Sequence, residues 1–344
     1  MKKLVFILTV IFWLYPSKSD AQVVIDSVNK TFSGVKSITV KGAYCSVKIE
    51  NGQGSIVGFE GKIIASAPYE GLMIKYEQKG NHLDVWIENF NKNPKISIKE
   101  GFLNFTVPSD IIIKVSNTSG SVLVEGVGRE TLNINTTSGS IKVSNIPCNT
   151  VLSSTSGSIY CSIINGNLSA KATSGSIKAD NIKGFAIINC TSGSIKISDV
   201  LKEVKLTSTS GAQSISSAFS DVTAQTTSGS ISLDNAKGSI NLKSTSGGIR
   251  INDVIGDINA RTTSGSIRGA QVMITGDSYF NSTSGGIRIG LLNERKSLSF
   301  ELKSTSGNLE VSGIRGGNKR LIINEGHIKI FGNSTSGGQN YYCE

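Results

Sequence analysis

The sequence predicts an all-β fold, a β-solenoid with two short strands in each coil of roughly 18 residues, preceded by a β-rich N-terminal portion. The tripeptide Thr-Ser-Gly recurs along the chain, and seven consecutive steps, from Thr137 to Thr263, have the same length. A fixed period of this size is typical of repeat proteins, whose units bury their apolar faces only by stacking. Within each period, apolar and polar residues alternate in two short runs, which is the pattern of β-strands. The tripeptides begin at Thr118, Thr137, Thr155, Thr173, Thr191, Thr209, Thr227, Thr245, Thr263, Thr283, Thr305 and Thr335.

Each coil is described here by numbering it from its Thr as position 1. Positions 5, 7 and 10 are apolar in most coils, as in Ile177, Ala179 and Ile182, and positions 14, 16 and 18 form a second alternating run, as in residues 168–172. Asn, Asp and Gly lie between the two runs and are predicted to supply turn conformations that bulkier residues resist. The apolar phase shifts by one residue across Thr-Ser-Gly, so the tripeptide is predicted to form the other corner.

Residues 1–21 have the features of a secretory signal peptide. Lys2 and Lys3 precede an apolar run from Leu4 to Tyr15, and a polar stretch ends at Ala21, after which we expect cleavage. The protein is therefore expected in the periplasm, at the cell surface or outside the cell. The apolar run is too short to span a bilayer, and no later segment reaches the about 18 unbroken apolar residues that a span requires, so we expect no membrane span.

The mature chain is predicted to have two parts. Residues 22–110 lack the Thr-Ser-Gly period but contain strand-like runs between turn signals such as Asn51-Gly52, and we expect them to cover the first open edge of the solenoid. Residues 111–344 form the repeat solenoid. After Thr283 the steps lengthen, first to Thr305 and then to Thr335, with an insertion around Leu291 to Ser297, which predicts an irregular C-terminal cap.

The net charge of the chain indicates which kinds of partner it favours. The formal net charge is +10, and +8 without residues 1–21. A basic exported protein favours anionic surfaces such as polysaccharides, lipid headgroups or nucleic acid. We expect an anionic polysaccharide or another envelope component, and nucleic acid is less favoured.

Five cysteines are present in a chain whose export would permit disulfides. Cys161 at position 7 and Cys190 at position 18 fall on inward positions, so both are predicted to be small buried apolar residues. An odd number leaves at least one thiol unpaired, and Cys343 beside the C-terminus is the expected one. The other two are Cys45 and Cys148.

Residues for catalysis are sparse. His82 and His327 are the only histidines and lie far apart in the sequence. Two such histidines are too few for a His-rich zinc site and make a Ser-His-Asp triad unfavourable, so both histidines are expected at the surface. The recurring glycines lack the Gly-Lys-Ser/Thr ending of a phosphate-binding loop. We therefore expect neither an enzyme nor a cofactor.

Two pairs of aspartates lie in consecutive coils, Asp180 with Asp199 and Asp234 with Asp253. Paired carboxylates can bind Ca²⁺, or act as acid and base in carbohydrate cleavage. Asn145, Asn181 and Asn235 occupy the same part of the coil without a charge, which favours a role in turn structure.

Position 6 carries an outward ladder of basic residues, and a second set at position 17 is expected on another face. Stacked coils lie about 4.8 Å apart, and like charges at about this distance repel by roughly 1 kcal/mol in water. We therefore predict that the ladder is a shallow anion-binding strip, in which Arg forks bind carboxylates or sulfates. The alternative is a solvated face that prevents association of the flat sheet. Position 6 holds Lys142, Lys178, Lys196, Arg250, Arg268 and Arg288, and position 17 holds Lys171, Lys243, Arg261 and Lys303.

Three segments carry a resemblance to a known family. They are Phe32-Ser-Gly-Val35, Phe105-Thr-Val-Pro108 and Ile113-Lys-Val-Ser-Asn-Thr-Ser-Gly-Ser-Val122, followed by repeated Thr-Ser-Gly-Ser-Ile units. Over essentially the whole mature chain, this arrangement resembles the bacterial "putative-adhesin" β-strand-repeat family, a domain of unknown function. The resemblance implies an exported envelope protein with a β-strand-repeat fold, and it implies no catalytic or ligand residues.

The function predicted from these features is that of an exported envelope or surface binding protein with an adhesive role. One alternative is a carbohydrate-active enzyme of the β-helix type, a polysaccharide lyase or hydrolase, but the regular coils show no local break where such a site would form. Another is an ice-binding solenoid with stacked threonines. A Thr row at a corner, alternating with Gly rather than paired across a flat face, disfavours ice binding.

Overall fold

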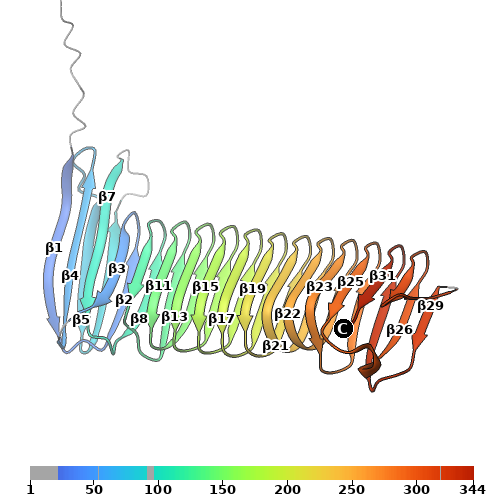
Figure 1. Cartoon of the computed structure of the whole chain (residues 1–344). Helices are drawn as coiled ribbons and strands as arrows, with labels where there is room; N and C mark the ends of the chain where they lie inside the picture. Colours follow the sequence, from blue (N-terminus) through green and yellow to red (C-terminus); the bar gives the residue numbers. More distant parts are fainter. Residues whose placement is uncertain (1–21, 53, 91–96, 318) are drawn as a thin grey trace, which may run out of the picture.

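The computed structural model describes residues 22–52, 54–90, 97–317 and 319–344. The predicted signal peptide, residues 1–21, lies outside the described residues. The described chain is a rod of stacked coils, in which two long parallel sheets face each other (Figure 1). The predicted β-solenoid with two strands per coil is confirmed.

The first sheet contains the strands that follow the Thr-Ser-Gly corner, and the second contains the strands that precede it. In the first sheet lie β9 (Val122–Glu125), β11 (Ile141–Ile146), β13 (Ile159–Ile164), β15 (Ile177–Ile182), β17 (Ile195–Val200), β19 (Gln213–Ala218), β23 (Ile267–Ile274) and β25 (Ile287–Leu291). In the second lie β8 (Ile112–Asn117), β10 (Thr131–Thr136), β12 (Asn149–Ser154), β14 (Leu168–Ala172), β16 (Ala186–Cys190), β18 (Val204–Ser208), β20 (Val222–Thr226) and β24 (Ser278–Ser282). Two long strands, β21 (Ile231–Ser244) and β22 (Ile249–Thr262), contribute to both sheets.

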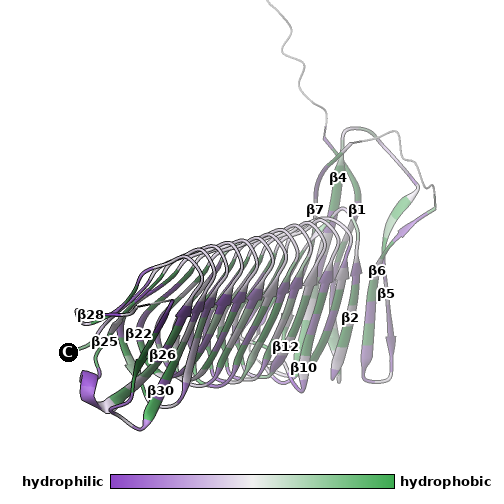
Figure 2. Ribbon diagram, turned by 90° about the vertical axis from the view of Figure 1, so that its right-hand side faces the viewer, coloured by the Kyte–Doolittle hydropathy of each residue, from purple (hydrophilic) through white to green (hydrophobic). Residues whose placement is uncertain are grey.

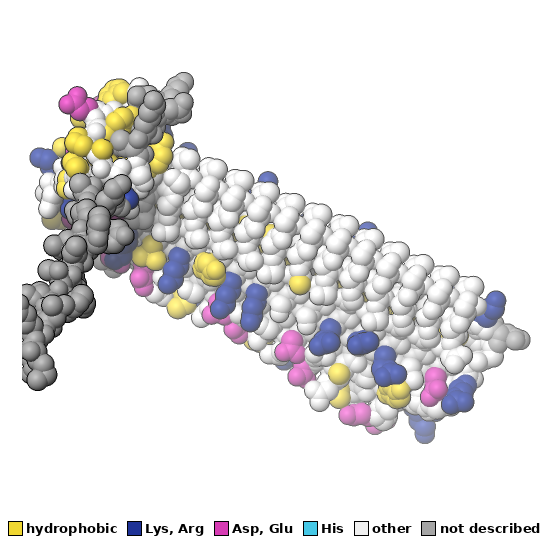
Figure 3. All heavy atoms as spheres, turned by 90° about the horizontal axis from the view of Figure 1, so that it is seen from above, with side chains coloured by type: hydrophobic (Ala, Val, Ile, Leu, Met, Phe, Trp, Pro, Cys, Tyr) yellow, Lys and Arg dark blue, Asp and Glu magenta, His cyan; other side chains and the backbone are white. Residues whose placement is uncertain are grey.

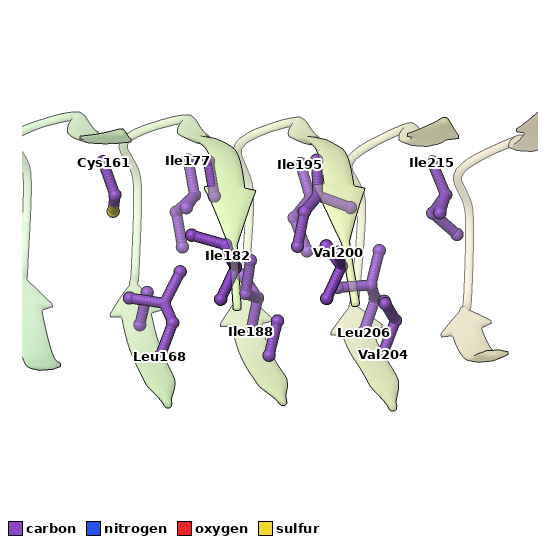
Figure 4. Close-up of a cluster of buried hydrophobic side chains, with 14 of the residues drawn as sticks. Cys161, Leu168, Ile177, Ile182, Ile188, Ile195, Val200, Val204, Leu206 and Ile215 are labelled. Carbon is purple, nitrogen blue, oxygen red and sulfur yellow. The ribbon is translucent and has the colours of Figure 1, made fainter. Parts of the chain in front are cut away.

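The core lies between the two sheets. Ile177, Ala179 and Ile182 of β15 are buried and pack against inward residues of the second sheet such as Leu168 and Ile188 (Figure 4). Because the register is the same from coil to coil, apolar and polar residues line up as continuous rows along the rod (Figure 2). The predicted inward positions 5, 7, 10, 14, 16 and 18 are confirmed.

One residue of each regular coil adopts the left-handed backbone conformation. It is position 9, near the end of the first strand of the coil, and its φ is 51 to 56° in eight consecutive coils, from Asn145 to Gln271. Asn and Asp tolerate this region better than other residues with a side chain, which explains Asn181 and Asp199 at this position. Ile163 occupies it as well, so the stacking of the coils holds even a β-branched residue there.

The glycines of the Thr-Ser-Gly corners are required by close stacking and not by a left-handed φ. A Cβ at Gly193 would collide with the carbonyl oxygen of Gly175 in the preceding coil, and the same collision recurs from Gly139 to Gly285. Of the glycines between the two runs, Gly184 and Gly256 have no left-handed φ either, and a Cβ there would meet the carbonyl oxygens of Gly166 and Gly238. A side chain at position 3 is unfavourable because successive backbones touch.

Small polar side chains at position 18 hydrogen-bond to the corner backbone from inside in most coils, whereas Ala172 occupies this position in one coil. The Ser244 hydroxyl accepts a hydrogen bond from the Gly247 N–H at 2.9 Å and donates one to the Gly229 carbonyl at 3.0 Å. At Cys190, the thiol takes both roles, with 3.2 Å to the Gly193 nitrogen and 3.3 Å to the Gly175 oxygen. Cys190 is buried as predicted, but it replaces a hydroxyl rather than an apolar side chain.

The N-terminal end of the rod interlocks its coils. The first coil along the chain, β2–β3, lies between coil β6–β7 and coil β8–β9, with parallel pairing on both sides. Antiparallel strands then end the sheets, because β5 pairs with β6, and β4 pairs with both β7 and β1. The strands are β1 (Val23–Ser33), β2 (Ser37–Gly42), β3 (Ser46–Asn51), β4 (Ile56–Ala65), β5 (Leu72–Lys79), β6 (His82–Asn89) and β7 (Ile98–Val107).

The C-terminal end is interlocked in the same manner. The last coil along the chain, β30–β31, lies between β24–β25 and β26–β27, so that Thr335 is stacked between Thr283 and Thr305. Antiparallel pairing of β28 with β27 and of β29 with β26 ends the two sheets. These elements are η1 (Arg295–Ser297), β26 (Leu298–Ser304), β27 (Leu309–Val311), β28 (Ile314–Arg315), β29 (Arg320–Ile323), β30 (Ile328–Ser334) and β31 (Gln339–Tyr342).

Candidate anion-binding groove

The predicted basic ladder lies on the outer face of the first sheet, and all six of its residues are exposed. Arg250, Arg268 and Arg288 are direct neighbours in register on β22, β23 and β25. Lys178 and Lys196 are also neighbours, whereas Tyr160 separates Lys142 from them. Seen from above, Lys and Arg side chains follow one side of the rod (Figure 3). The structure therefore assembles the three arginines into one row and places the lysines in a separate group.

The three arginines differ from the other arginines of the chain in having no partner. The remaining five all have a polar side-chain partner, and in four of them it is a carboxylate. The five pairs are Arg129–Asp110, Arg261–Asn259, Arg295–Glu325, Arg315–Glu310 and Arg320–Glu301. Within the part of the chain that the structure describes, no side chain bonds to Arg250, Arg268 or Arg288.

The next outward residues of the arginine coils are uncharged. Two residues after each Arg, these positions hold Asn252, Ala270 and Gly290. In the lysine group, by contrast, Asp180 stands two residues after Lys178 and accepts a hydrogen bond from Ser198. Two acids lie farther along, Asp253 on β22 and Glu310, which pairs with Arg315, and among the described residues neither forms an ion pair with an arginine of the row.

A groove follows the arginine row. One hollow of about 410 Å³ is lined by Arg250, Gly248 and Arg268, and a second of about 690 Å³ is lined by Arg268, Arg288 and Gly286. They share Ser266 and Arg268 and are therefore adjacent. We call these two hollows, with the three arginines, the arginine groove.

Glycines at position 4 form part of the lining of the groove, and the fold does not require them. A Cβ at Gly248 would lie 3.3 Å from the Ser266 oxygen, and one at Gly286 would lie 3.4 Å from the Gly338 oxygen, which is tight but short of a collision. Neither glycine has a left-handed φ. Serine occupies the same position in other coils, at Ser140, Ser158, Ser176, Ser194, Ser230 and Ser266. A signal for the groove was therefore visible in the sequence, as Thr-Ser-Gly-Gly in place of Thr-Ser-Gly-Ser, and was not identified there.

The Thr and Ser of the corner tripeptides form two exposed rows. The Gly that follows them faces the preceding coil, so the exposed neighbour of each Thr is Ser, and Thr does not alternate with Gly on the surface. The rows nevertheless run along a corner of the rod and not on either flat sheet face.

The aspartate pairs do not form paired sites. Asp199 and Asp253 occupy the left-handed position 9, which confirms their role in the turn. Asp180 and Asp234 lie one position earlier, opposite Ser198 and Asn252, so the two carboxylates of a pair are offset in register. The described residues contain no cluster of His, Cys, Asp or Glu that could hold a metal ion.

His82 has more contacts than a lone surface residue. Its Nδ1 lies 2.7 Å from the Ser37 hydroxyl, and its Nε2 lies 3.2 Å from an Asp84 carboxylate oxygen. Acyl transfer by such a set of side chains also needs free N–H donors for an oxyanion. The Ser37 amide is not free, because it donates to the Asn81 carbonyl at 3.2 Å. His327 is exposed as expected.

No helix in the described part of the chain is long and apolar enough to cross a membrane. Lys171, Lys243 and Lys303, which the sequence places at position 17, are exposed on the second sheet, away from the groove, together with Arg261.

Comparisons with known proteins place this fold in a family. No curated protein matches the sequence. Two solved structures are similar: a "putative cell adhesion protein" from Clostridium sporogenes, 12% identical with a TM-score of 0.24 and covering 92% of this chain and 99% of that one, and a "putative adhesin" from Bacteroides fragilis, 12% identical with a TM-score of 0.25 and covering 92% and 96%. With TM-scores this low, the two structures say nothing about the function of this chain. The Toastrack DUF4097 family model matches residues 95–217 and 186–313, which together are more than half of the chain. The chain therefore belongs to the Toastrack DUF4097 family, a β-strand-repeat family of unknown function as the sequence predicted.

Proposed function

We propose that the protein is an exported, non-catalytic surface binding protein that holds an anionic polymer in the arginine groove. The observation that carries the proposal is the row of Arg250, Arg268 and Arg288, three neighbouring guanidinium groups without a partner among the described residues. Adjacent positive charges repel by roughly 1 kcal/mol even in water. A polymer with acid groups would replace that repulsion by attraction.

The geometry suits a polymer better than a single small anion. Each guanidinium can bind a carboxylate or sulfate through two parallel hydrogen bonds. One such contact at an exposed site is weak, but three contacts on consecutive coils, about 4.8 Å apart, act together and raise the overall affinity. An adhesive role follows if the polymer belongs to another surface.

The test compares two variants with the same change in net charge. Arg250, Arg268 and Arg288 are replaced by Gln in one, and the exposed Lys171, Lys205 and Lys243 of the second sheet are replaced by Gln in the other. On immobilised polygalacturonate and hyaluronan, we expect the arginine variant to lose at least about tenfold in affinity, equivalent to about 1.4 kcal/mol, and the lysine control to change little. Retention should fall with added salt because exposed charges are screened. Equal losses of affinity in both variants would show that binding depends on the net charge of the protein and not on the arginine groove.

Export is tested separately. Fractionation of the producing cells, followed by protease treatment of intact cells, should find the protein outside the cytoplasm and cleaved from the surface. Recovery from the cytoplasm alone would contradict the proposal.

A further inference from the structure

The arginine groove has a division that charge does not explain. Going along position 4, the lining reads Ser230, Gly248, Ser266, Gly286 and Gly338. Position 4 lacks a side chain at Gly248 in the smaller hollow and at Gly286 and Gly338 in the larger one, and Ser266 lines both hollows. Gly286 and Gly338 lie two and three coils from Gly248, about 10 and 14 Å at the spacing of paired strands. An arginine, by contrast, stands on each of the three coils that begin the groove.

We propose that the ligand of the groove is an acidic polysaccharide with a two-sugar repeat, in which an acidic sugar alternates with one that carries a bulky uncharged substituent. This inference rests on the proposed function. A pyranose ring with its glycosidic oxygen advances a chain by about the length of one coil, so substituents on every second sugar recur at about the separation of the two hollows. Acid groups on every second sugar then reach Arg250 and Arg288, which are two coils apart, while the bulky groups occupy the hollows.

The lining of the hollows supports a sugar chain over a single-stranded nucleic acid. Proteins that bind single strands stack the bases on aromatic side chains, and among the described residues no aromatic side chain lines either hollow. The lining consists instead of glycine, serine, isoleucine and arginine, joined at the far end by Asn308, Glu310, Gln339 and Asn340. Hydroxyl and amide groups of this kind pair with sugar hydroxyls and acetamido groups.

The inference separates shape from charge, so its test leaves the charge alone. The double variant Gly248→Ser with Gly286→Ser narrows both hollows with a side chain that seven other coils carry at this position. Binding is measured to hyaluronan, which has a two-sugar repeat with an acetamido group, and to polygalacturonate, which has an acid on every sugar and no such group. We expect hyaluronan affinity to fall about tenfold, equivalent to about 1.4 kcal/mol, and polygalacturonate affinity to change less than about twofold.

Controls distinguish the ways in which the inference can fail. Ala212→Ser makes the same kind of change at position 4 outside the groove and should affect neither polymer, and thermal melting shows whether each variant is folded. If the glycine variant binds both polymers as the wild type does, or loses both equally, the two-sugar inference is wrong. If the triple arginine variant also binds as the wild type does, the proposed function itself has failed.

Discussion

Two groups of coils in the middle of the rod share a backbone and differ in their outer surface. The coils with Lys178 and Lys196 have a left-handed residue at position 9 and isoleucine at position 5, and so does the coil with Arg250. On the outside, the lysine coils carry serine at position 4 and Asp180 two residues after Lys178, whereas two of the three arginine coils carry glycine at position 4, Gly248 and Gly286, and all three have an uncharged residue two positions after the Arg. Because the fold accepts both surfaces, the arginine surface needs an explanation outside folding.

The largest expected effect tests the shared core. Ile195 is 1% exposed between the sheets, and Ile195→Asp places an unpaired charge there, which should cost more than about 4 kcal/mol and unfold several coils. The neighbouring Lys196→Asp changes an exposed residue and should leave the melting curve nearly unchanged. Circular dichroism measures both. An unchanged melting temperature for Ile195→Asp would show that the assigned register is wrong.

An intermediate effect separates the two kinds of corner glycine. Gly193→Ala introduces a Cβ that collides with the Gly175 carbonyl, and overpacking of this kind typically costs about 1–3 kcal/mol. Gly248→Ala meets its nearest atom at 3.3 Å and should change stability by less than about 0.5 kcal/mol. Urea unfolding of the two variants gives the difference. Similar losses of stability in the two variants would mean that the stacking of the coils requires glycine at Gly248. The glycine would then be no evidence for a functional hollow.

A smaller effect concerns Cys161, in the core of the coil directly before the lysine coils. Burial raises the pKa of the Cys161 thiol to about 12 from an ordinary value of 9.0. The unfolded chain therefore loses this proton first, so the contribution to stability is complete below pH 9 and is lost as the pH rises toward 12, at about 1.4 kcal/mol per pH unit. Cys161→Val, with the side chain that Val143 provides at the same position, should remove this part of the alkaline loss.

The measurement is urea unfolding at pH 8 and pH 10. The wild type should lose about 1 to 1.5 kcal/mol more than the variant between these values. An equal loss in both would show that Cys161 ionises as readily in the folded protein as in the unfolded chain.

The regular coils could be predicted from the sequence because one short pattern fixes them. Alternation at Ile177, Ala179 and Ile182 determines which face is buried, and the phase shift at Thr-Ser-Gly determines the corner. The row of arginines followed from the same numbering. The hollows could not be predicted from it. The fold needs glycine at position 3 but not at position 4, and the two glycines differ only in their distance to the neighbouring coil.

The order of the terminal coils could not be predicted either. Coil β30–β31 lies between β24–β25 and β26–β27. Backbone pairing between parallel strands is the same whichever coils are neighbours, so it does not reveal their order. The side chains that would signal the insertion resemble those of any other coil, as Ser334-Thr-Ser-Gly337 illustrates. His82 was placed at the surface for a related reason, since Ser37 is distant in the sequence and becomes its neighbour only through the β2–β6 pairing.

The interlocked ends also constrain how such a protein can change its length. The last coil of the chain is held between two others, so a coil added directly after it would have no free sheet edge to join. A single coil duplicated or deleted in the middle, by contrast, leaves both ends as they are and shifts one end along the axis. The near-identical units lie in that middle segment, and the divergent ones lie at the ends. Each coil gained or lost there would change the length of the rod by about 4.8 Å.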